Sequence, residues 1–148
     1  MKNLIALSIF LLTTITSIAQ TYRIGVTEIR SYKSIGNLNY ENVIQNYFWD
    51  SGLENVNCVY VFDLTKKTST FYNQGSYVNT LKFNKLTESD GVYTFQITDY
   101  NKYNPTESIT TTFVLDTKSD KLFMSWYDPK NNVTRTQTHT KVKFTDPT

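Results

Sequence analysis

The feature that most constrains the fold of this chain is an alternation of apolar and polar residues with a period of two. Tyr93, Phe95 and Ile97 show it, and several other stretches repeat it. Side chains on a β-strand point alternately to opposite faces, so this pattern indicates strands with one face in a core. Threonine, tyrosine and phenylalanine, which favour strands, are abundant in these stretches. The pattern therefore predicts an antiparallel all-β fold.

Turn signals separate these stretches and divide the chain into about eight strands. Residues 73–76 and the pair Asp90-Gly91 are the clearest, because Asn, Asp and Gly suit tight hairpin turns. Gly25 is expected to mark a bulge in the first strand. The predicted strands cover residues 22–32, 56–64, 68–72, 77–83, 93–97, 109–115, 122–126 and 133–144.

Short connections between the predicted strands indicate a meander, because sequential strands joined by tight turns usually pair with one another. A meander of this size either closes into an up-and-down barrel or folds over into a sandwich of two sheets. The barrel is favoured, because closure removes the two exposed edges and the chain has few prolines to protect them.

Residues 36–55 leave two interpretations open. Val43, Ile44 and Tyr47 have helical spacing, and Asn39 is placed to cap a short helix near residues 40–48. Residues 44–49 also alternate as a strand does, and the local pattern of residues 36–55 does not decide between helix, strand and loop.

The N-terminal segment has the features of a signal peptide. Lys2 precedes an apolar run over residues 4–12, which is too short to span a bilayer, and Ser17 and Ala19 have the small-residue spacing of a cleavage site. We expect cleavage after residue 19 and one domain over residues 20–148. The mature chain has no further segment apolar enough to cross a membrane, so we expect a periplasmic, outer-surface or extracellular protein.

Charge and cysteine content exclude several function classes. The net charge is +2 and falls to +1 when Lys2 is removed, which provides no long-range field to gather nucleic acid. Cys58 is the only cysteine, so no intramolecular disulfide forms, and its apolar strand predicts a buried, unreactive thiol. We expect no cofactor and no metal site, because one His and one Cys do not make a zinc site without two carboxylates.

No catalytic residue is predicted from a motif. His139 is the only histidine, and no serine lies in a GxSxG sequence. His139 alternates with Arg135 and Gln137, which indicates either a solvated face of the last strand or an anion-binding strip over residues 135–143. A carboxylate pair assembled only in space stays open, so a small extracellular hydrolase is the alternative function.

Aromatic residues are the compositional excess, with 2 Trp, 11 Tyr and 9 Phe. They favour a non-catalytic binding or interaction module that recognises a small apolar ligand, a glycan or a partner protein through aromatic contacts rather than charge. If the rings fill the barrel, binding must use Tyr and Trp at a rim or outside it. An unpaired apolar edge strand would instead indicate a surface assembly. The candidate ligand-binding residues are Trp49, Trp126, Tyr93, Arg135 and His139.

The order of elements also carries a resemblance. VYVFDL at residues 59–64, TFY at 70–72, the Asp90-Gly91 turn and KLFMSW at 121–126 resemble a group of small exported β-rich proteins from Bacteroidota. The leader ending in Ala19-Gln20 resembles theirs as well. The resemblance implies a calycin-like meander and supplies no catalytic or binding residue.

Overall fold

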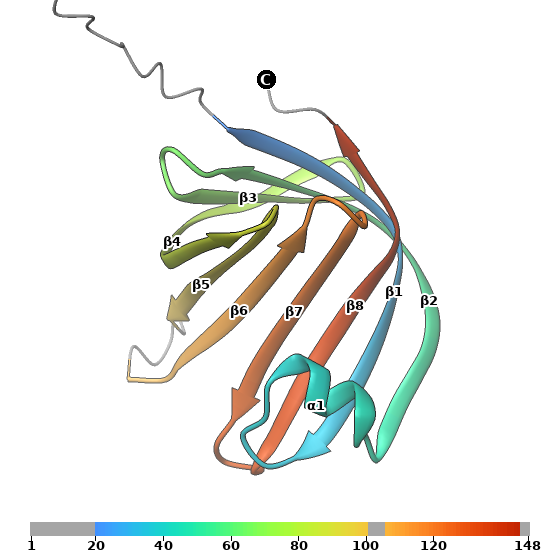
Figure 1. Cartoon of the computed structure of the whole chain (residues 1–148). Coiled ribbons are helices and arrows are strands. Elements are labelled where there is room, and N and C mark those ends of the chain that lie inside the picture. Colours follow the sequence, from blue (N-terminus) through green and yellow to red (C-terminus); the bar gives the residue numbers. More distant parts are fainter. Residues whose placement is uncertain (1–19, 101–105, 146–148) are drawn as a thin grey trace, which may run out of the picture.

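The computed structural model describes residues 20–100 and 106–145, and they form one closed antiparallel barrel with a short helix outside it (Figure 1). Each strand pairs with the next along the chain, and β8 pairs with β1 to close the ring. The predicted meander and the preferred barrel are thus confirmed over the two-sheet sandwich. The elements are β1 (Thr21–Ile35), α1 (Tyr40–Gln45), β2 (Trp49–Asp63), β3 (Thr68–Asn73), β4 (Ser76–Ser89), β5 (Val92–Tyr100), β6 (Ser108–Asp116), β7 (Lys121–Asp128) and β8 (Val133–Thr145).

The expected signal peptide and its cleavage site lie mostly outside the described residues, which begin at Gln20. Within the described part of the chain, no helix has the length and apolarity needed to cross a membrane.

Aromatic rings fill the half of the barrel nearest its two chain ends, at the top of Figure 1. Phe62 lies at their centre, with ring centroids 5.0 Å from Phe95 and 5.7 Å from Phe113. Tyr60 adds a ring parallel to that of Phe62, at 5.9 Å. This half of the interior is therefore a packed core of side chains.

Residues 36–55 contain a short helix and the start of β2. The helix interpretation is correct over residues 40–45, whereas the strand interpretation of residues 44–49 is wrong because β2 begins only at Trp49. Asn39 caps α1 as predicted, and its side-chain oxygen accepts from the backbone N–H of Asn42 at 2.9 Å. Val43 is fully buried, and the ring of Tyr40 stacks on Phe123 of β7 at 4.7 Å. The helix therefore covers the outer wall of the barrel and leaves the interior to the strands.

Two irregularities in the β1–β2 ladder lie after Gly25 and not at it. Gly25 pairs regularly with Val59, which corrects the predicted bulge. The first register shift lies between Val26 and Glu28. The second lies between Arg30 and Tyr32, where two residues of β2 oppose one residue of β1. Bulges of this kind bend a strand and increase its twist, which helps long strands wrap around a barrel.

The ladder is incomplete at the other end of the barrel, at the bottom of Figure 1. β3 pairs with β2 only from Cys58 onward, so residues 49–57 of β2 pair, within the described chain, with β1 alone. On the opposite side, β4 and β5 pair only from Phe83 and Ile97 toward their shared turn. The barrel therefore has an open mouth at this end. Leu53, which lies in this part of β2, is exposed.

The β4–β5 turn offers a stability test with a matched control. Gly91 and Gly75 share a φ of +79°, but a Cβ at Gly91 would lie 3.1 Å from Thr117 Oγ1, whereas one at Gly75 meets nothing within 4 Å. We expect Gly75→Ala to lower the free energy of unfolding by about 1 kcal/mol through backbone strain alone. We expect Gly91→Ala to cost about 1 kcal/mol more, because Thr117 donates to the Gly91 carbonyl at 2.8 Å and has to shift. Equal losses in urea unfolding would contradict this difference.

Candidate ligand-binding site at the barrel mouth

Four side chains form one row across the inner face of the sheet at the open mouth. Trp49 of β2 pairs with Lys33 of β1, Lys33 pairs with Arg135 of β8, and Arg135 pairs with Trp126 of β7. Leu122 and Met124 pack in the interior, so the alternation of β7 places Trp126 on the same inner face. We call these four residues the mouth row. It consists of two neighbouring cations with a tryptophan at each end.

A pocket of about 830 Å³ adjoins the row on the side of β5, β6 and β7. Trp126 and Arg135 line it together with Thr111, the next residue along the row. Ile109 and Asp99, which pair with each other nearer the rim, extend its wall. The pocket is therefore an extension of the mouth row with a mixed polar and apolar lining.

The layer directly inside the mouth row is polar beneath the two cations and apolar beneath Trp126. Ser31 and Gln137 are cross-strand neighbours, and Gln137 Nε2 donates to Ser31 Oγ at 3.3 Å. Met124 and Phe113 continue this layer on the neighbouring strands. Tyr60, which belongs to the packed core, donates a hydrogen bond from Oη to Met124 Sδ at 3.6 Å. The floor of the mouth is thus polar beneath the two cations and closed by the core behind it.

The ring of Trp49 lies beside the ammonium group of Lys33, with Nζ 4.0 Å from the ring centroid. This distance is well inside the range of a cation–π contact. Trp49 keeps 40% of its surface exposed, so part of the side chain remains open to solvent. The contact therefore orients Trp49 without burying it.

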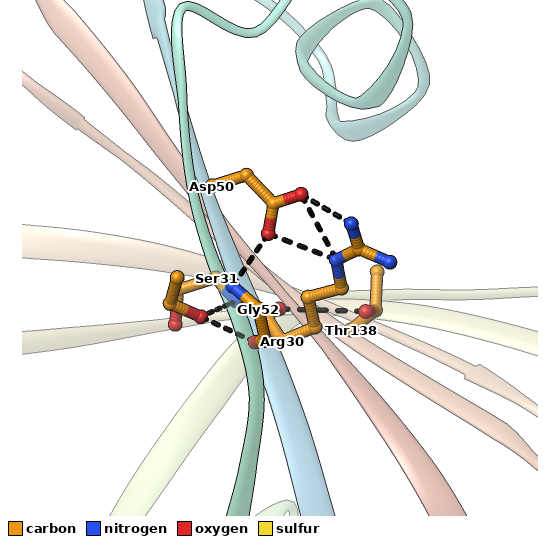
Figure 2. A network of polar contacts seen from close by, with 6 residues as sticks. Arg30, Ser31, Asp50, Gly52 and Thr138 are labelled. Carbon is orange, nitrogen blue, oxygen red and sulfur yellow. Dashed lines mark hydrogen bonds and ion pairs between the residues drawn. The ribbon is translucent and has the colours of Figure 1, made fainter.

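A polar network on the outer side of the sheet holds the start of β2 in register (Figure 2). Asp50 accepts from Arg30 Nε at 2.8 Å and from the backbone N–H of Gly52 at 2.8 Å. The backbone N–H of Ser31 donates to Ser51 Oγ at 2.9 Å, across the second bulge. Gly52 has a φ of +71°, which suits the left-handed residue of a bulge. The guanidinium of Arg30 lowers the pKa of Asp50 to about 2, so this carboxylate stays charged.

This network matters to the site because a slip of one residue moves every side chain of a strand to the other face. The bulge at residues 51–52 decides that Trp49 lies opposite Lys33, on the inner face. Arg30 and Asp50 therefore act as positioning residues for Trp49.

The two cations of the row lack an acidic partner in the described chain. None of the ion pairs formed within residues 20–100 and 106–145 includes Lys33 or Arg135. The charge of Arg135 contributes to the lowered pKa of Asp128, but that carboxylate accepts mainly from Asn131. The row thus retains unpaired positive charge between two aromatic rings.

The structure brings together three of the five residues predicted from the sequence to bind a ligand, namely Trp49, Trp126 and Arg135. Tyr93 is not among them. It lies in the filled half of the barrel, where its ring is 5.7 Å from that of Tyr22 and its hydroxyl donates to Gln20 Oε1 at 3.2 Å.

His139 is neither on a solvated face nor in a surface strip, and both sequence interpretations of it are corrected. Only 4% of its surface is exposed, its ring meets that of Tyr60 edge-on at 5.7 Å, and Nδ1 lies 3.0 Å from the Leu122 carbonyl. Burial lowers the pKa of His139 to about 4, although the bond to the carbonyl opposes that shift. The side chains of Lys141 and Lys143, which completed the predicted strip, lie outside the described part of the chain.

Cys58 faces the interior as predicted, but it is only half buried. It packs against the core cluster, and burial raises the pKa of its thiol. Both features disfavour a reactive thiolate.

Lys33 is the residue that sequence reasoning missed. The predicted first strand ended at residue 32, so Lys33 fell into a region without an assigned face, whereas β1 continues to Ile35. The available signal was the alternation of Ile29, Ser31 and Lys33, which share a face and pair with residues 139, 137 and 135 of β8.

Comparisons of the chain with protein-family models, with curated proteins and with solved structures gave no match.

Proposed function

We propose that this protein is an exported, non-catalytic binding module that holds its ligand at the open mouth of the barrel, on the tryptophan rings of the mouth row. The observation that carries the proposal is that the chain's two tryptophans lie at the ends of one cross-strand row beside a pocket of about 830 Å³. Tryptophan offers a large rigid surface and is enriched where binding energy is concentrated. Export rests on the expected signal peptide and on the resemblance to exported β-rich proteins of Bacteroidota.

A small hydrolase is the second candidate, because Asp99, Glu107 and Asp128 all line the mouth pocket. A carboxylate pair that cleaves a glycoside needs one member that holds a proton. Hydrogen bonds from Asn131 lower the pKa of Asp128, and Glu107 accepts from Lys130 Nζ at 2.7 Å. Both contacts favour the ionised carboxylate, which supports binding over cleavage. Release of reducing ends from an oligosaccharide, lost in Asp99→Asn, would instead establish the hydrolase.

The intrinsic fluorescence of the protein tests the proposed site directly, since both fluorophores lie in the mouth row. We expect that titration with a panel of neutral and acidic oligosaccharides, long-chain fatty acids and extended peptides shifts the emission with at least one class. Trp126→Ala is expected to weaken the binding of that ligand by about fivefold to a hundredfold, since stacking on one aromatic ring is worth about 1–3 kcal/mol.

Tyr77→Ala is the matched control, because Tyr77 is an exposed aromatic residue of β4 outside the mouth row. It should leave the affinity unchanged. Trp126→Phe keeps an aromatic ring and should retain most of the binding. A ligand whose affinity survives both Trp126→Ala and Trp49→Ala would place recognition elsewhere on the protein.

A further inference from the structure

We propose that the ligand of the mouth row is an acidic oligosaccharide, with a carboxylate or sulfate group between Lys33 and Arg135 and sugar rings on Trp49 and Trp126. This inference rests on the proposed function and adds the charge, length and class of the ligand. It departs from the sequence-based expectation that aromatic contacts act without charge.

The charge of the ligand follows from the two adjacent cations. Lys33 and Arg135 are directly opposite on neighbouring strands, which brings their Cβ atoms to about 5 Å, and like charges so placed destabilise a sheet. Both side chains are half buried, so water screens them less than at an open surface. An anion bound between them removes the repulsion, and the planar guanidinium of Arg135 matches the oxygens of a carboxylate or sulfate.

The length of the ligand follows from the strand order. The strands that carry Trp49 and Trp126, β2 and β7, are separated by three strand spacings, about 14 Å from backbone to backbone along the wall of the barrel. The two tryptophans therefore offer separate stacking positions, one on each side of the two cations. A molecule that contacts both rings and also carries an acid near its middle is therefore an elongated oligomer.

The floor of the mouth argues against a fatty acid, which would also present a carboxylate. An acyl tail needs a deep apolar cavity, but the layer beneath the cations is the hydrogen-bonded pair Ser31 and Gln137. Behind it, Tyr60, Phe62 and Phe113 fill the interior. The site therefore suits a polar ligand lying across the mouth.

The rim argues against single-stranded nucleic acid, which could also combine stacking with negative charge. Asp99, Glu107 and Asp128 line the mouth pocket and would repel a phosphate at every nucleotide. The same oxygens are acceptors for sugar hydroxyl groups. Isolated acid groups on a hydroxyl-rich chain fit this distribution of charge.

The test compares ligands that differ only in charge, using calorimetric titration of the whole mature protein. The first pair is a neutral oligosaccharide that carries a single uronic acid near its middle and the methyl ester of the same molecule, which tests carboxylates. The second pair is a sulfated galactan oligomer and its desulfated form, which tests sulfates. We expect at least one acid to bind ten times or more tightly than its neutral partner at low salt, and the difference to shrink as salt is raised.

Variants of the two cations test whether the preference for the acidic oligosaccharide arises at the mouth row. Lys33→Gln and Arg135→Gln should each weaken the acidic oligomer about fivefold to tenfold and leave the neutral oligomer unchanged. Arg135→Lys keeps the charge and should restore part of the preference, even if Arg135→Gln proves unstable. Lys66→Gln and Lys118→Gln remove cations at the opposite end of the barrel and should have no effect.

Equal affinity for the acidic and neutral forms would overturn the inference while leaving the proposed binding function intact. Tighter binding of a single-stranded oligonucleotide or a fatty acid than of any acidic sugar would overturn it as well. If no probe of any class binds, the inference and the proposed function fail together.

Discussion

Phe62→Ala is expected to lower the free energy of unfolding by about 3–5 kcal/mol, the range for removal of a buried aromatic ring. Phe62 has no exposed surface and contacts the rings of Tyr60, Phe95 and Phe113. These neighbours belong to three different strands of a closed ring, so they have little freedom to collapse into the space. The loss includes both the burial of the ring and the cavity left behind.

Equilibrium urea unfolding followed by circular dichroism measures this change. Phe48→Ala is the matched control, because 60% of the surface of Phe48 is exposed, and it should stay within about 0.5 kcal/mol of the parent protein. The slope of the free energy against urea should be unchanged in both variants, so that the shift in midpoint reports stability alone. Similar midpoints for the two variants would mean that Phe62 does not lie at the centre of the core.

The barrel was predictable because its signal is local and repeated. Apolar residues alternate along β5 from Tyr93 to Ile97 and along β6 through Phe113 and Leu115, and these residues do form the core. The ends of the strands were less predictable. β4 continues to Ser89 although the predicted strand stopped at Phe83, since backbone pairing with β5 extends to Ser89.

The candidate site was only partly predictable, because it depends on register. Trp49, Trp126 and Arg135 were each singled out by residue type, but their positions in the sequence do not show that they form a row. Their adjacency is set by the bulge at residues 51–52 and by the β1–β8 pairing, which bring distant segments together. Bulges insert single residues without a strong local signal, so the sequence alone left these three residues as separate candidates.

His139 is a residue whose burial could not be predicted from the sequence, because the prediction assumed a regular alternation of faces along β8. Simple alternation placed it on the face opposite Val142, yet Val142 packs against the core and His139 is buried among core residues. The two positions differ by three residues, so the phase of β8 changes between them. β1 changes phase in the same place, since Val26 and Ile29 both contact the interior. Strict period-two reasoning does not capture this shift.

The burial of His139 leads to a pH effect on stability. Its pKa is about 4 in the folded protein, against 6.5 for an ordinary histidine, because burial disfavours the charged ring. The unfolded chain therefore binds a proton more readily than the folded barrel. The stabilising contribution is complete above pH 6.5 and is lost as the pH falls from 6.5 to about 4. A gap of this size corresponds to about 3 kcal/mol of unfolding free energy.

The one carboxylate in the positioning network, Asp50, titrates at lower pH than His139. Arg30 lowers the pKa of Asp50 to about 2 from an ordinary value of 3.8, so the contribution of Asp50 is lost only below about pH 4. Urea unfolding at a series of pH values between 7 and 4.5 covers most of the histidine's window, and comparison with His139 variants isolates its contribution. We expect the parent protein to lose about 2–3 kcal/mol over this range.

His139→Gln should remove most of that slope, whatever its effect on stability at pH 7, because glutamine does not titrate and can still donate to the Leu122 carbonyl. His139→Phe, which keeps a ring against Tyr60, should remove it as well. Because each variant is compared with itself across pH, a constant loss of packing does not obscure the result. A slope that persists in both variants would show that His139 does not control the acid sensitivity of the barrel.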